Sequence, residues 1–230
     1  MDNVFAMTLV LATVIALSPT AIIVVLLLLL GPRARGNGLA FLIGWLVGLG
    51  MLSLVALALV QTGRLAADRW FPPTASGLRA LLGLALILTG IIAWRRRPSD
   101  QSEAPLPSWV ASIDSLKSGH AGAMGAALAG LSPKMIIITT GLALQLVQEN
   151  LARGLTLLDL GVYILIGSLT IAAPVLYRLF SGSSADQTLV TLRQWLIVNN
   201  TRIVAASLLL VGGMMVIGGL RSLSGSFPRA

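Results

Sequence analysis

The sequence contains no cysteine and a single histidine, His120, and only 10% of its residues are charged. Without cysteine there is no structural disulfide, thiolate metal site or dithiol redox relay. One histidine without other ligands around it argues against a metal centre. No glycine–lysine dipeptide is present to complete a phosphate-binding P-loop, so we expect neither ATP hydrolysis nor any other enzymatic activity, and no cofactor.

Apolar residues are abundant instead. They make up 56% of the 230 residues, and the mean hydropathy is +0.91. A soluble globule could not cover its surface with so few charges. The net charge of +8 comes mostly from basic residues that flank apolar runs, so nucleic acid is not an expected partner. The alternation typical of barrel strands is missing, so we predict an all-α integral membrane protein.

Runs of about 20 apolar residues are long enough to span a bilayer. The sequence predicts six such spans, at residues 4–30, 38–60, 77–94, 121–146, 155–180 and 203–220. No basic residue precedes the first run, and it is longer than the core of a signal peptide, so we interpret it as a retained span.

Lysine and arginine are unevenly distributed between the predicted loops. The first, third and fifth loops hold more of them than the other loops and the termini, and the run Arg95–Arg97 is the strongest cluster. The positive-inside tendency places those three loops in the cytoplasm. We therefore expect a multi-pass protein of the plasma (inner) membrane with both termini outside.

The third loop, residues 98–120, is predicted to be a cytoplasmic linker. Its first half is rich in proline and therefore extended. Trp109, Val110, Ile113 and Leu116 then fall on one helical face, which is typical of a short amphipathic helix lying in the membrane interface. The alternative is a solvated linker.

The two halves of the chain share ordered motifs. The tripeptide Leu-Ser-Pro occurs at 17–19 and again at 131–133, and Gly-Leu opens both the second and the fifth span. Such ordered matches indicate duplication, with one repeat at 1–97 and the other at 121–230. Because each repeat has three spans, the second copy must enter the membrane from the opposite face. The prediction is two inverted three-helix repeats, as in many secondary transporters.

Pro19 and Pro133 fall near the centres of the first and fourth spans. Each removes a helical hydrogen bond, and the freed carbonyls are tolerated where they face protein or a wet cavity. We therefore predict helix breaks beside a central pathway, with an ordinary packing kink as the alternative. The candidate pathway residues around the two prolines are Ser18, Pro19, Thr20, Ser132, Pro133 and Lys134.

Lys134 lies midway along the fourth span, where a lysine costs about 3 kcal/mol by insertion scales. Asp159, near the start of the fifth span, is the acidic residue best placed to pair with it. The pair could contact an anion or carry a proton on the pathway. The alternatives are a structural ion pair, or a lysine that extends to the membrane surface.

Neutral polar and small residues complete the candidate set. For Thr139, Thr140, Ser168 and Thr170 the commonest role is a hydrogen bond back to their own helix. Four glycines are predicted to permit close helix packing, within the chain or between subunits. They are Gly44, Gly48, Gly212 and Gly213.

Two long stretches resemble a known family. "ALSPTAIIVVLLLLLGPRARGNGLAFLIGWLVGLG" and "LPSWVASIDSLKSGHAGAMGAALAGLSPKMIIITTGLAL" are similar to the signature regions of the peptidoglycolipid-addressing (GAP) family. That family includes the sulfolipid-1-addressing proteins of mycobacteria and belongs to the lysine-exporter-like (LysE) superfamily. Its fourth-span motif usually reads Asn-Pro-Lys-Asn, whereas this chain has Ser132-Pro133-Lys134-Met135. The loss of both amides puts the identity of the cargo in doubt.

The resemblance implies a membrane transporter, or an accessory factor, that exports a lipid-linked molecule of the glycolipid type toward the cell surface by alternating access. One alternative is a small-solute exporter, for an amino acid or a cation. Another is a non-transporting scaffold of a larger lipid-export complex. Candidate partners are membrane lipids, larger lipid-export machinery and a second copy of the chain.

Overall fold

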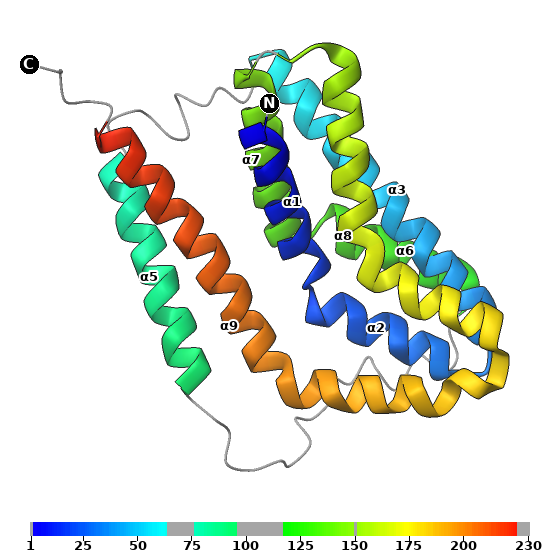
Figure 1. Ribbon diagram of the computed structural model, residues 1–230. Helices are drawn as coiled ribbons and strands as arrows, with labels where there is room; N and C mark the ends of the chain where they lie inside the picture. The colour runs from blue at the N-terminus through cyan, green and yellow to red at the C-terminus, as the bar shows by residue number, and fades with distance from the viewer. Residues whose placement is uncertain (1, 64–75, 96–116, 150, 225–230) are drawn as a thin grey trace, which may run out of the picture.

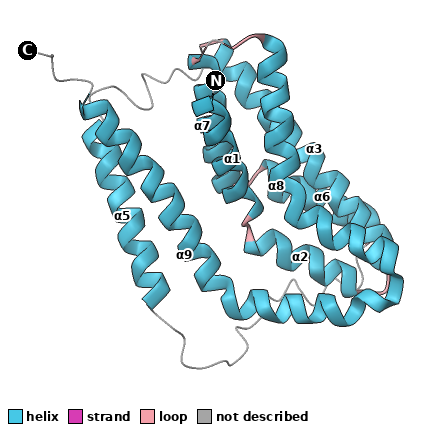
Figure 2. Cartoon of the chain, in the orientation of Figure 1, coloured by secondary structure: helices cyan, strands magenta, loops and turns pink. Residues whose placement is uncertain are grey.

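The computed structural model describes residues 2–63, 76–95, 117–149 and 151–224, and these are helical with short connections and no strand (Figure 2). The prediction of an all-α membrane protein is confirmed in its fold class. The predicted interfacial helix around Trp109 lies outside the described residues. The helices are α1 (Asp2–Ala16), α2 (Pro19–Leu30), α3 (Ala34–Gln61), α5 (Ser76–Arg95), α6 (Ser118–Gly130), α7 (Pro133–Gln148), α8 (Arg153–Ser181) and α9 (Asp186–Ser224), with a 3-10 turn, η3 (Gly182–Ala185), before the last.

Two of these helices, α3 and α8, are each long and apolar enough to cross a membrane alone. Three bent pairs, α1 with α2, α6 with α7 and the two halves of α9, pass the same criterion when each pair is taken together. The described residues therefore hold between two and five candidate spans, against the six predicted. The third predicted span falls on α5, a helix of 20 residues that contains the apolar helical stretch Gly83–Ile92.

Helix α9 differs from the prediction, which placed a loop before a sixth span at 203–220. The helix starts at Asp186 and bends by 62° between Asn199 and Thr201. No proline or glycine interrupts residues 186–211, so nothing in the sequence ends the helix before the apolar segment. In Figure 1 the first half crosses the end of the bundle beside α2, and the second half runs alongside α5.

Both Leu-Ser-Pro tripeptides break a helix. Ser18 and Ser132 adopt extended backbone conformations, and each following proline occupies the first turn of a new helix, where its missing N–H is not needed. The helices on either side meet at 51° in the first pair and at 54° in the second. The same three residues thus produce the same local structure in both halves of the chain.

The bundle is organised around α3 and α8. Helix α3 packs against α6 and α7, and α8 packs in the same manner against α1 and α2, while α3 and α8 contact one another. Phe41, Trp45 and Leu49 of α3 are fully buried, as is Tyr163 of α8. Large apolar side chains such as Met51 remain exposed on the outer faces, as expected for surfaces that meet lipid.

Glycines bring α3 and α6 close together. A Cβ on Gly44 would overlap the backbone carbonyl of Gly122, and one on Gly48 would overlap that of Ala126. In the α5–α9 pair, a Cβ on Gly212 would lie 2.7 Å from the carbonyl oxygen of Gly83. Gly213 has no such neighbour within 4 Å. Close backbone approach at small residues is the usual basis of helix association in membranes.

Three connections lie at one end of the bundle. The Ser118 hydroxyl at the start of α6 donates a hydrogen bond of 3.0 Å to Oδ1 of Asn37 near the start of α3. Arg33, before α3, and Arg178, near the end of α8, line a single cavity. The residues after helices α2 and α8 and before α6 therefore share one end, and α3 and α8 run in opposite directions.

Replacing Gly44 with alanine should separate α3 from α6, because the backbone of Gly122 cannot move aside cheaply. The expected cost is about 1–3 kcal/mol, typical of overpacking. Gly50→Ala is the matched control, since it is on the same helix, gains the same helix propensity and has nothing within 4 Å. Thermal unfolding in detergent compares the two variants. Equal midpoints would contradict the close packing of α3 and α6.

Candidate functional site

The break between α1 and α2 frees the last carbonyls of α1. Pro19 has no N–H to offer, and Ser18 and Leu17 leave the helical path after Ala16. In water these carbonyls would be solvated, but inside a membrane they need partners from the protein. The end of α1 is therefore a polar point within an apolar bundle.

Side chains from the second half of the chain provide those partners. The Lys134 ammonium donates a hydrogen bond of 3.0 Å to the carbonyl oxygen of Val14, and the Thr170 hydroxyl donates one of 2.6 Å to that of Ala16. Lys134 belongs to α7 and Thr170 to α8. A positive charge at a helix C-terminus also interacts favourably with the helix dipole. The two broken helices thus meet at Lys134.

The anticipated ion pair between Lys134 and Asp159 is not formed. The hydroxyl of Thr8 donates a hydrogen bond of 2.5 Å to Oδ2 of Asp159, whose side chain is buried. Among the described residues the one ion pair joins Arg178 to Asp186, far along the chain from either group. Lys134 and Asp159 therefore bond to different residues of α1, Val14 and Thr8.

Asp159 also lines a mostly apolar cavity of about 370 Å³ between the first turns of α1 and α8. Val4, Phe5 and Leu9 line it from α1, and Leu155 and Leu158 from α8. A carboxyl group at the edge of an apolar cavity can hold a proton or contact a polar group on an amphiphile.

The neutral polar residues form contacts between helices more often than expected. Thr139 and Tyr163 share a hydrogen bond of 2.8 Å that joins α7 to α8. Thr170 bonds to α1, and the buried hydroxyl of Ser168 has no protein partner. The expectation of hydrogen bonds back to the same helix is therefore wrong for Thr139 and Thr170. In each span they are simply polar residues among apolar ones, and the sequence does not say which neighbour they face.

The remaining candidates lie at the two breaks without cross-helix bonds. Neither Ser18 nor Ser132 caps the helix that follows with its side chain. Pro19 is buried, whereas Pro133 and Thr20 are exposed. Thr20 occupies the position in the first repeat that corresponds to Lys134 in the second. In the part of the chain that the structure describes, no group of three His, Asp or Glu residues could hold a metal ion.

The family model for Sap, the sulfolipid-1-addressing protein, matches residues 8–221, which is nearly the whole chain and includes both Leu-Ser-Pro breaks. Comparison with curated proteins and with solved structures gives no match. The extent of the family match shows that this chain belongs to the sulfolipid-1-addressing protein family.

Proposed function

We propose that the protein exports a lipid-linked, glycolipid-type molecule toward the cell surface, or assists its export, by alternating access at the point where the two broken helices meet. The observation that carries this proposal is the hydrogen bond of 3.0 Å from Lys134 in α7 to Val14 in α1. Membership of a lipid-addressing family supports a lipid cargo. The plasma membrane, with both termini outside, is the proposed location.

Paired contacts support two inverted three-helix repeats. The packing of α3 on α6 has its counterpart in α8 on α1, and that of α3 on α7 in α8 on α2. The two bends differ by only a few degrees, at 51° and 54°. Helices α3 and α8, which occupy equivalent places in the halves, are antiparallel. A pseudo-two-fold axis in the membrane plane relates such repeats in transporters that alternate access.

Lys134 is suited to act as a latch between the halves. Movement of α7 relative to α1 must break its bond to Val14, a charge-assisted hydrogen bond worth about 1.5–3 kcal/mol. An anionic group on the cargo would offer the ammonium another partner and so lower the cost of that movement. Binding of cargo and opening of the latch would then be coupled.

Asp159 supports a second candidate, the small-solute exporter. Its buried carboxyl group accepts a hydrogen bond from Thr8 and has no cationic partner among the described residues, as would suit a proton or a small cation.

A scaffold of a larger lipid-export complex is the third candidate function. It would copurify with that complex and move no lipid in liposomes. Comparative lipid analysis of surface extracts from deletion and complemented strains distinguishes lipid export from the small-solute exporter and from the scaffold.

The inverted arrangement predicts which loops share a side. Because the chain has no cysteine, single cysteines can be introduced without removing any. Arg33→Cys and Lys117→Cys should react with a membrane-impermeant maleimide from one side, and Thr62→Cys and Ala152→Cys from the other. Labelling of whole cells and of inverted vesicles checks this. Reaction of Arg33→Cys and Lys117→Cys from opposite sides would exclude the inverted repeat.

Replacement of Lys134 by methionine should reduce surface delivery of the lipid about tenfold or more, because the latch and its charge are lost together. Thr20→Met is the matched control, since it changes the corresponding position of the first repeat to the same residue, and Thr20 is exposed. Lipids are quantified in surface extracts, and protein in the membrane fraction. If the Lys134→Met variant is present at a normal level and delivers as much lipid as the wild type, Lys134 does not act as a latch.

Asp159→Asn should abolish any dependence of delivery on the proton gradient, because an amide still accepts the Thr8 hydrogen bond but cannot take up a proton. Delivery is measured with and without a protonophore. Thr8→Val is the companion variant that removes only the hydrogen bond and should keep the dependence. If delivery by the wild-type protein is insensitive to the protonophore, Asp159 carries no proton for transport.

A further inference from the structure

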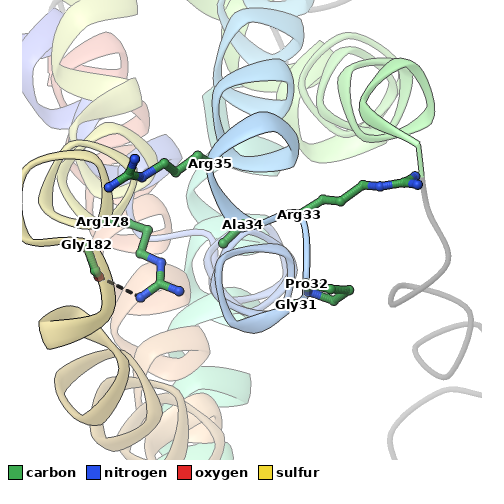
Figure 3. Close-up of a pocket in the computed structure, with 7 residues that line it drawn as sticks. All are labelled: Gly31, Pro32, Arg33, Ala34, Arg35, Arg178 and Gly182. Atoms are coloured by element: carbon green, nitrogen blue, oxygen red, sulfur yellow. Dashed lines mark hydrogen bonds between the residues drawn. The ribbon is translucent and has the colours of Figure 1, made fainter.

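A second site lies away from Lys134, where the first and fifth connections of the bundle come together. It is an open cavity of about 360 Å³ lined by Gly31, Pro32, Arg33, Ala34, Arg35, Arg178 and Gly182. Three of these seven residues are arginines, and none is acidic. Figure 3 shows Arg35 and Arg178 extending from two different helices on the same side of the first connection, with Arg33 extending on the other side.

The arginines are only partly neutralised. Asp186 pairs with Arg178, and no other ion pair is found in the described ranges. Arg33 and Arg35 are both exposed, and neither has an acidic partner there. The cavity therefore carries excess positive charge, and guanidinium groups are the preferred donors to phosphate and sulfate oxygens.

The backbone is arranged to hold these groups in place. Gly182 has a φ of 56°, a conformation that favours glycine, and its carbonyl oxygen accepts a hydrogen bond of 2.6 Å from Nη1 of Arg178. A Cβ at Gly182 would lie 3.5 Å from Nη2 of Arg35, so the two arginines flank this residue. The 28-residue helix α3 also begins at the cavity without a side-chain cap, and its positive dipole end adds to the field of the arginines.

The cavity lies at the ends of two candidate membrane spans. Helices α3 and α8 are the two that can each span a membrane alone, and the cavity lies at the first turn of one and just past the last turn of the other. Ends of spanning helices lie in the headgroup region, where basic residues attract anionic lipids.

We propose that this cavity binds the headgroup of an anionic membrane lipid through Arg35 and Arg178, with Arg33 adding charge at its rim. The ligand class is a phospholipid whose headgroup carries a phosphate ester and a net negative charge. This site is independent of the proposed export path, because none of its residues contacts Lys134, Thr170 or Asp159 in a described hydrogen bond.

Binding is tested on the full chain in phosphatidylcholine nanodiscs that contain a trace of dansyl-labelled phosphatidylglycerol, read by energy transfer from tryptophan. Dansyl-phosphatidylcholine is the zwitterionic control. The wild-type protein should prefer phosphatidylglycerol, and Arg35→Gln should reduce that preference about five- to tenfold. The Arg35→Lys variant keeps the charge but loses the planar donor fork, so its preference for phosphatidylglycerol should lie between those of the wild type and Arg35→Gln.

Arg153→Gln is the matched control, because it removes an exposed arginine at the opposite end of α8 and should leave the preference unchanged. Inorganic phosphate is added at ionic strength matched with sodium chloride. If the site binds lipid, the dansyl-labelled phosphatidylglycerol should stay bound. Displacement of this lipid by phosphate beyond the salt control would identify a site for free anions and overturn the proposal. Equal preference in wild type and Arg35→Gln would overturn it as well. Lys134→Met should bind phosphatidylglycerol normally, so failure of the export proposal leaves this result intact.

Discussion

A backbone carbonyl freed inside a membrane must find a donor within the protein, and this requirement governs the centre of the structure. Pro19 breaks the first span and leaves the end of α1 without its helical partners. Lys134 and Thr170 provide donors to Val14 and Ala16. Because these donors come from the second half of the chain, the break is also one of the places where the two halves are joined.

The same contact explains why a lysine is tolerated at mid-span. An ammonium in hydrocarbon is costly, but carbonyls at a helix C-terminus offer both hydrogen-bond acceptors and negative potential. An acidic residue could have served as well, but Asp159 bonds to Thr8, six residues before Val14 in α1. Lys134 can thus be retained without a counter-ion among the described residues.

The halves are alike in backbone and unlike in chemistry. Both tripeptides break a helix at nearly the same angle, but the residue after the proline is an exposed threonine in one half and a cross-linking lysine in the other. Of the two residues that follow the prolines, only Lys134 bonds to a helix of the other half of the chain.

Much of the backbone could be predicted from the sequence, because proline chemistry and apolar run length are local properties. The breaks at Ser18-Pro19 and Ser132-Pro133 and the long helices α3 and α8 follow from such local rules. The hydrogen-bond partner of each polar side chain could not be predicted in this way, since it depends on how the helices rotate and tilt against one another. Thr8 and Thr170 are each one polar residue in an apolar run, and nothing local indicates that they contact Asp159 and Ala16. The first half of α9 was missed because its polar composition is typical of a loop, although no residue there ends a helix.

The two ends of the bundle differ in the kind of lipid group that each can hold. At one end three arginines line an open cavity, and at the other an apolar cavity has a single carboxyl group at its edge. A lipid with an anionic headgroup is attracted to the first and repelled by an ionised Asp159 at the second. Lys134 lines neither cavity, and its ammonium bonds to the end of α1. Electrostatics alone would therefore retain an anionic lipid at the arginine end of the bundle, apart from Lys134.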